Sequence, residues 1–185
     1  MKITKKELLT IPNLMGYFRL LLIPVFLYLY CTAKSNRDYY LAAFVIVISG
    51  ITDFLDGYVA RKFNQVTEFG KALDPIADKL TQGALVLALS TRYPLMIALV
   101  VLFVIKEGFM LVMGIVFLRK GKRLDGAMWF GKVCTAILYV VMFVLILFPQ
   151  LPALLVNVLI LICGAAMLLA LVLYVPVFYR MGKSI

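Results

Sequence analysis

Four aspartates stand close together in a stretch that reads DFLDGYVARKFNQVTEFGKALDPIAD. They are four of the chain's nine acidic residues, namely Asp53, Asp56, Asp74 and Asp78. The segments around them are otherwise apolar enough to cross a membrane, where carboxylates normally mark an ion pathway, a reactive site or a paired network. The first two are three residues apart and the last two are four apart, which places each pair on one face of a helix.

Carboxylates held this close repel one another unless they are protonated or neutralised by cations. Hard divalent ions such as Mg²⁺, Mn²⁺ or Ca²⁺ suit an all-oxygen cluster, and two such ions form a centre for phosphoryl transfer. Gly57 and Ala60 remove side-chain bulk beside the first pair, and Arg61 offers a planar guanidinium to a phosphate. An ion-conducting or proton-relay site remains a second interpretation, because intramembrane acids are also common in such sites.

The two pairs are expected to lie at one depth in the membrane. A helix that ends near Arg61 and one that begins near Gly70 are joined by a short loop and should pack antiparallel. Asp53 precedes Arg61 by eight residues and Asp78 follows Gly70 by eight, so both lie roughly 12 Å from the helix ends. The other two aspartates lie some 5 Å shallower. All four carboxylates should therefore converge near the cytoplasmic face.

Three further residues have expected structural roles. Gly70 is expected to permit the turn into the second of these helices, and Pro75 to kink or loosen it between the aspartates. Arg19 is a charged residue inside an apolar run. Its side chain either snorkels toward the membrane face or binds an anionic ligand.

Composition places the whole chain in a membrane. Of 185 residues, 64% are hydrophobic and 15% charged, with a mean hydropathy of +1.04, which a water-soluble globule does not have. The sequence predicts an all-α integral membrane protein, one domain over residues 1–185, with an amphipathic interfacial helix in residues 1–10. Six transmembrane helices are expected over residues 14–33, 39–61, 70–91, 94–118, 129–148 and 153–179.

The charges predict an orientation and exclude some chemistry. With six spans both termini lie on one side, and most basic residues fall there, so that side is cytoplasmic and the protein is multi-pass in the cell membrane. The net charge of +10 fits this orientation and anionic lipids rather than nucleic acid. Three cysteines without CxxC spacing predict no disulfide framework or zinc site. The absence of histidine excludes every mechanism that needs an imidazole.

The acidic residues and their small neighbours resemble the full signature of the CDP-alcohol phosphotransferases, here Asp53-x2-Asp56-Gly57-x2-Ala60-Arg61-x8-Gly70-x3-Asp74-x3-Asp78. The resemblance extends to the six-span plan and to Pro12-Asn13 followed by Arg19. It implies an integral membrane enzyme, usually a homodimer, that transfers a phosphatidyl group from CDP-diacylglycerol to an alcohol and releases CMP.

The resemblance also implies roles for single residues. Two divalent metal ions, Mg²⁺ or Mn²⁺, would be held by Asp53, Asp56, Asp74 and Asp78. Asp78 would in addition take the proton of the acceptor hydroxyl. The pocket for the CDP lipid would be lined by Gly57, Ala60, Arg61 and Gly70. The lack of histidine separates the chain from the unrelated phospholipase-D-like cardiolipin synthases, which use paired histidines.

The stretch from Asp53 to Leu80 resembles bacterial phosphatidylglycerophosphate synthases and CDP-lipid-dependent cardiolipin synthases. It implies glycerol 3-phosphate as the acceptor, with phosphatidylglycerol or an inositol phosphate as alternatives. An acceptor phosphate needs a second cationic pocket, for which the expected donors are Lys106, Arg119 and Lys132. Lys106-Glu107 stands where an Arg-Glu pair is usual, which keeps the alternatives open. A membrane transporter or an inactive scaffold is the non-enzyme alternative.

Overall fold

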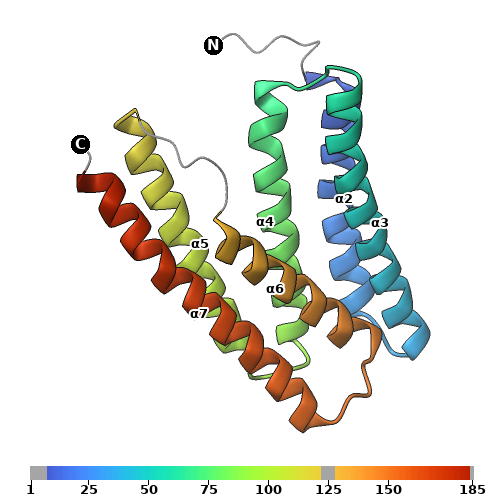
Figure 1. Cartoon of the computed structure of the whole chain (residues 1–185). Coiled ribbons are helices and arrows are strands. Elements are labelled where there is room, and N and C mark those ends of the chain that lie inside the picture. Colours follow the sequence, from blue (N-terminus) through green and yellow to red (C-terminus); the bar gives the residue numbers. More distant parts are fainter. Residues whose placement is uncertain (1–7, 122–127, 184–185) are drawn as a thin grey trace. The chain divides into compact units, whose positions relative to one another are not determined.

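A computed structural model describes residues 8–121 and 128–183 of the chain. Within these residues the regular structure is helical, with no strand. The six helices, labelled in Figure 1, are α2 (Ile11–Cys31), α3 (Asn36–Lys62), α4 (Glu68–Ser90), α5 (Met96–Arg119), α6 (Trp129–Leu147) and α7 (Ala153–Lys183). The predicted all-α fold is confirmed, and each expected span corresponds to one of these helices.

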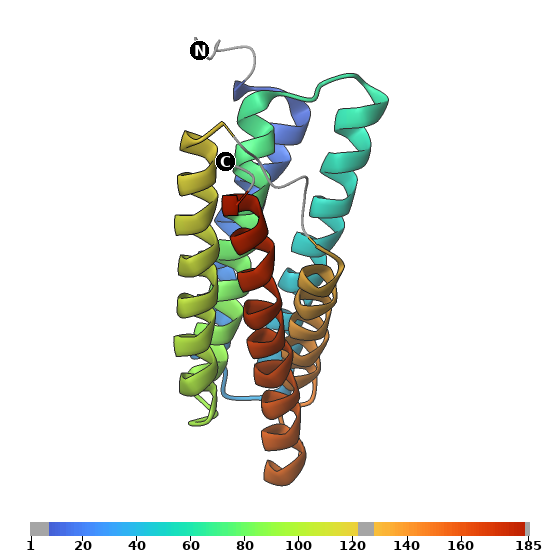
Figure 2. The ribbon, with the colours of Figure 1, turned by 60° about the vertical axis from the view of Figure 1, so that its left-hand side comes forward.

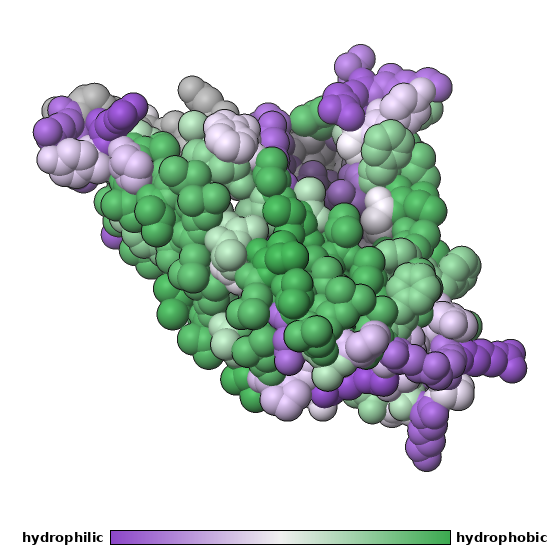
Figure 3. All heavy atoms as spheres, turned by 60° about the horizontal axis from the view of Figure 1, so that its bottom comes forward, coloured by the Kyte–Doolittle hydropathy of each residue, from purple (hydrophilic) through white to green (hydrophobic). Residues whose placement is uncertain are grey.

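Five of the six helices are long and apolar enough to cross a membrane. The other is α4, which has 23 residues and carries Asp74, Asp78 and Lys79 near its middle. Hydrophobic residues cover the helix flanks on the face that Figure 3 shows, and hydrophilic residues gather toward helix ends. The chain is therefore a multi-pass membrane protein, and the crossing by α4 stays a prediction. The expected amphipathic helix lies mostly in residues 1–7, outside the described residues.

The chain divides into two compact units, residues 1–88 and 89–185. In the first unit α2 packs along α3, and α4 returns antiparallel to α3 (Figures 1 and 2). Phe26 and Tyr30 are buried in this unit, with ring centroids 5.9 Å apart. A Cβ on Gly16 would lie 2.8 Å from Leu73 Cδ2, so the glycine lets α4 approach α2. The expected single domain stays a prediction.

The connection between α3 and α4 sets the register of the two acidic pairs. The N–H of Phe63 donates to the carbonyl of Val59, and Asn64 then adopts a left-handed conformation with φ 52°. Asn is one of the few residues other than glycine that tolerates this conformation, which reverses the chain. The prediction that Gly70 makes the turn is wrong, because Gly70 lies inside α4. The helix also continues through Pro75.

In the second unit α7 packs against both α5 and α6. Aromatic rings fill this contact: Phe117 stacks on Phe178 at a centroid distance of 5.7 Å, and Phe130 meets Tyr174 edge-on at 4.7 Å. A Cβ on Gly131 would overlap the hydroxyl of the buried Tyr174. Glycine at this point therefore allows α6 and α7 to approach closely.

Replacing Gly131 by alanine is expected to destabilise the protein by about 1–3 kcal/mol, because the added methyl group would overlap Tyr174. Gly114→Ala is the matched control, since a Cβ there meets nothing within 4 Å and alanine is the better helix former. Thermal unfolding in detergent measures both variants. A Gly131→Ala protein that unfolds at or above the wild-type temperature would contradict this packing.

Candidate active site

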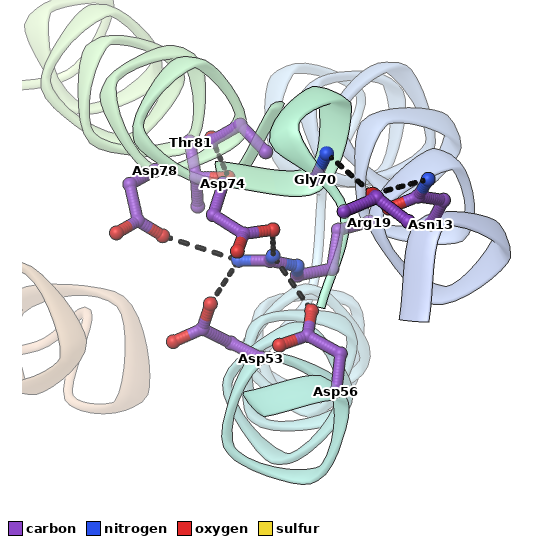
Figure 4. Close-up of polar contacts among 10 residues, drawn as sticks. Asn13, Arg19, Asp53, Asp56, Gly70, Asp74, Asp78 and Thr81 are labelled. Atoms are coloured by element: carbon purple, nitrogen blue, oxygen red, sulfur yellow. Dashed lines mark hydrogen bonds and ion pairs between the residues drawn. The ribbon is translucent and has the colours of Figure 1, made fainter. Parts of the chain in front are cut away.

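One guanidinium lies at the centre of the acidic cluster, which comprises Asp53, Asp56, Asp74 and Asp78. Arg19 projects from α2 between α3 and α4, is 2% exposed, and forms ion pairs with all four carboxylates (Figure 4). Its Nη1 contacts Asp53 and lies 3.1 Å from Asp78. Its Nη2 lies 2.7 Å from Asp56 and 3.4 Å from Asp74. Three helices therefore meet at one buried cation.

The contacts of the two guanidinium nitrogens reproduce the predicted depths. Nη1 joins the two deeper aspartates, Asp53 of α3 and Asp78 of α4. Nη2 joins the two shallower ones, Asp56 and Asp74. Each nitrogen thus links α3 to α4 at one level, as the spacing from the helix ends predicted. The convergence of the four carboxylates follows from helical rise and the antiparallel return.

The carboxylates differ in exposure. The Asp56 side chain is 5% exposed, whereas those of Asp53, Asp74 and Asp78 are 42–50% exposed. Burial of Asp56 is tolerable because its carboxylate accepts a charge-assisted hydrogen bond from Arg19. The other three present an open side to further ligands.

The chemistry of the acidic cluster fits divalent metal ions. Carboxylate oxygens are the ligands that Mg²⁺ and Mn²⁺ prefer, and four carboxylates around one guanidinium leave a surplus of negative charge. Within residues 8–121 and 128–183, no three acidic, cysteine or histidine side chains are already arranged around one metal-sized point. The space between the carboxylates holds the Arg19 guanidinium (Figure 4).

A hollow of about 300 Å³ adjoins the acidic cluster. Asp56 and Asp74 belong to the acidic cluster and also line the hollow. The remaining lining residues come from the start of α2, the end of α3, the connecting loop and the start of α4, and they are Pro12, Asn13, Gly57, Ala60, Gln65, Val66, Thr67, Gly70 and Lys71. This volume includes space that is open to solvent.

Three of the four residues expected to line a CDP-lipid pocket, Gly57, Ala60 and Gly70, line this hollow. Arg61, the fourth, is exposed. Its Nη2 lies 3.9 Å from the position that a Cβ on Gly57 would take. This distance is an ordinary van der Waals contact, so the guanidinium of Arg61 lies close to Gly57, a residue that lines the hollow.

Gly70 allows a close contact between α2 and α4. Thr67 precedes α4 and caps it, because its Oγ1 accepts a hydrogen bond from the Gly70 N–H at 2.9 Å. Asn13 of α2, which is 2% exposed, donates from Nδ2 to the same oxygen at 3.1 Å. A Cβ on Gly70 would lie 2.6 Å from Asn13 Oδ1. Glycine is needed here for space, and its conformational freedom is not used.

Sequence reasoning missed the position of Arg19 and the link between Asn13 and Thr67. The snorkelling interpretation of Arg19 is wrong, because its side chain is buried and ion-paired within the acidic cluster. The available signal was a lone arginine inside an apolar run, which requires a buried partner or an exit to water. Nothing in the spacing identified α3 and α4 as the source of that partner.

The three cations expected to hold an acceptor phosphate all belong to the second unit. Lys106 is buried, and its Nζ donates to Glu107 Oε1 at 2.5 Å. Arg119, the last residue of α5, and Lys132, in the first turns of α6, are exposed. Lys106 is thus already paired with a carboxylate. The acceptor role of all three stays a prediction.

Comparison with known proteins finds relatives among enzymes named for CDP-lipid chemistry. The chain is 46% identical over 79 residues to the CDP-diacylglycerol–glycerol-3-phosphate 3-phosphatidyltransferase of Rickettsia typhi, over 43% of this chain and 44% of that protein. It is 47% identical over 72 residues to the protein of the same name from Pseudomonas fluorescens, over 39% of this chain and 36% of that protein. It is 32% identical over 137 residues to the cardiolipin synthase (CMP-forming) of Streptomyces coelicolor, over 72% of this chain and 63% of that protein.

The match to a whole family is broader than these pairwise matches. The chain spans less than half the length of the Rickettsia and Pseudomonas relatives. The sequence model described as CDP-alcohol phosphatidyltransferase, in contrast, matches residues 9–176, which include Arg19, the acidic cluster and every residue that lines the hollow. Because this match covers most of the chain and all of the site, the chain belongs to the CDP-alcohol phosphatidyltransferase family.

Proposed function

We propose that the protein is an enzyme of phospholipid biosynthesis that transfers a phosphatidyl group from CDP-diacylglycerol to an alcohol and releases CMP. The observation that carries the proposal is the acidic cluster, in which four carboxylates converge beside a hollow of about 300 Å³ in a chain of this family. A transporter or an inactive scaffold is less well supported, because all four carboxylates of the signature are present and lie together.

The acidic cluster is proposed to hold two divalent metal ions, Mg²⁺ or Mn²⁺. Asp53, Asp56, Asp74 and Asp78 supply hard oxygen ligands, and three of them are open to further ligands. When bound, such ions neutralise a pyrophosphate and stabilise the negative charge that develops during phosphoryl transfer.

The hollow is proposed to receive the nucleotide end of the CDP lipid. Gly57, Ala60 and Gly70 leave it free of bulk, while Asn13 and Gln65 supply amide groups to its wall. Asp56 and Asp74 connect it to the acidic cluster, so a nucleotide in the hollow would place its phosphates next to the carboxylates. The exposed guanidinium of Arg61 is suited to a phosphate oxygen at the rim.

Asp78 is proposed as the base. Its side chain is 42% exposed and belongs to the deeper level of the acidic cluster, so a hydroxyl can reach it. In the proposed reaction its carboxylate takes the proton of the acceptor hydroxyl, and the hydroxyl oxygen attacks the lipid-bearing phosphorus. The bond from that phosphorus to the bridging oxygen breaks, and CMP leaves with the electron pair.

Glycerol 3-phosphate is the proposed acceptor, which would give phosphatidylglycerophosphate. Phosphatidylglycerol is the main alternative, because one relative is named as a cardiolipin synthase, and an inositol phosphate remains a third. Lys106, Arg119 and Lys132 remain the proposed cations for an acceptor phosphate. We further propose that the site faces the cytoplasm from the cell membrane, which the distribution of basic residues supports. The proposal that the protein is a homodimer rests on the family resemblance alone.

Asp78→Asn is expected to lower CMP release by about 10²–10⁴-fold, because an amide cannot accept the hydroxyl proton. The protein should remain folded, since an amide of the same size can still contact Arg19. Glu68→Gln is the matched control, an acid-to-amide change in the exposed first turn of the same helix. CMP release from purified protein in detergent measures both, and near-normal release from Asp78→Asn would remove Asp78 from the base role.

Arg61→Ala is expected to raise KM for CDP-diacylglycerol about tenfold, because a charge-assisted contact to a phosphate oxygen is lost. Lys62→Ala is the control, because Lys62 is the next residue and is also an exposed cation at the end of α3. Steady-state kinetics in mixed micelles separates KM from kcat. Equal kinetics for the two variants would exclude Arg61 from the CDP-lipid site.

The same assay tests the metal requirement and identifies the acceptor. Removing divalent cations with EDTA is expected to abolish CMP release, and adding back Mg²⁺ or Mn²⁺ to restore it. Acceptors are supplied one at a time: glycerol 3-phosphate, phosphatidylglycerol and inositol phosphate. Release with glycerol 3-phosphate alone would support the proposed product. If none of the three acceptors led to CMP release, in protein shown to bind CDP-diacylglycerol, the acceptor would be another alcohol or the protein would be an inactive scaffold.

A further inference from the structure

Arg19 occupies the space in which metal ions are proposed to bind. Its guanidinium contacts one oxygen of each carboxylate in the acidic cluster, and it is enclosed by them with 2% of the residue exposed (Figure 4). A metal ion that uses the same oxygens would lie within a few ångströms of the guanidinium. Two cations at that separation repel strongly, especially away from bulk water.

The net charge of the acidic cluster differs between a state that holds Arg19 alone and a state that holds two divalent ions. Four carboxylates and one guanidinium carry a net charge of −3, so Arg19 neutralises only part of the cluster. Two divalent ions would by themselves balance all four carboxylates. The guanidinium would then be a surplus positive charge, with no electrostatic reason to stay between them.

The present position of Arg19 does not satisfy all of its hydrogen-bond donors. Its Nε is buried and, in the part of the chain that the structure describes, has no hydrogen-bond partner. The present position of the side chain therefore leaves one donor unsatisfied, and another position could satisfy it. Its Nη2 lies between Asp56 and Asp74, the two carboxylates of the acidic cluster that also line the hollow.

We propose that Arg19 is an exchangeable counter-cation: it holds the acidic cluster together when metal ions are absent, and metal binding displaces its guanidinium from between the four carboxylates. The inference rests on the metal centre of the proposed function. Arg19 is in this sense a positioning residue, which keeps α3 and α4 at the correct register before the metal ions bind. It also makes metal binding weaker than the carboxylates alone would allow, because a bound cation must first be removed.

Arg19→Gln separates these two effects. In EDTA the variant should unfold at a lower temperature than the wild type, because four carboxylates then face one another without a cation. Its affinity for Mn²⁺ should nevertheless be about tenfold higher, because no guanidinium has to be displaced. The rise in unfolding temperature on adding Mn²⁺ should therefore be larger for the variant than for the wild type.

The experiment titrates purified protein in detergent with Mn²⁺, measures free Mn²⁺ by electron paramagnetic resonance, and follows thermal unfolding with EDTA or Mn²⁺. Lys79→Gln is the matched control, because it removes one positive charge next to Asp78 from a side chain that bonds to Gln82. Arg19→Lys is the second variant, should Arg19→Gln not fold. A lysine ammonium cannot bridge four carboxylates at once, so Mn²⁺ affinity should rise by a smaller factor.

If the wild type binds Mn²⁺ and both Arg19 variants bind it with the same or a lower affinity, the proposed exchange of Arg19 is wrong. The proposed function would not be affected by that result. If Lys79→Gln raised the affinity for Mn²⁺ by the same factor, the effect would come from the loss of any nearby positive charge. That result would also overturn the exchange of Arg19. If neither the wild type nor the variants bind Mn²⁺, the metal centre fails and the exchange fails with it.

Discussion

The structure depends on one electrostatic constraint: four carboxylates must stay together inside an apolar helical protein. Their mutual repulsion would separate α3 from α4 if nothing opposed it. Arg19 opposes it by placing each of its two terminal nitrogens between one carboxylate of α3 and one of α4. A planar guanidinium can do this, whereas a single ammonium cannot reach both levels at once.

The rest of the first unit brings three helices within reach of that guanidinium. Gly16 lets Leu73 of α4 pack against α2, and Gly70 leaves room for the Asn13 side chain. Asn64 reverses the chain in a left-handed conformation, so that α4 starts at the level at which α3 ends. Small residues and one tight turn thus determine the distances between the charged groups, although these residues carry no charge themselves.

The sequence predicted the helices and the meeting of the aspartates well, because both depend on regular periods. Long apolar runs define the helices, and the fixed rise per residue places Asp53 level with Asp78. Contacts that depend on tertiary packing were not predictable. Arg19 lies in α2, and no spacing relates it to carboxylates 34 to 59 residues away. Gly70 was assigned to a turn because glycine serves turns and close contacts equally, and only the position of Asn13 distinguishes the two.

The walls shared by the acidic cluster and the hollow have a thermodynamic consequence. Since Asp56 and Asp74 face both, occupancy of one compartment changes the free energy of filling the other. Thermodynamic linkage makes that change reciprocal. A bound cation would change the affinity for a nucleotide by some factor, and a bound nucleotide would change the affinity for the cation by the same factor. If the two proposed ligands strengthen each other's binding, the departure of the nucleotide product would weaken the binding of the cations by the same factor.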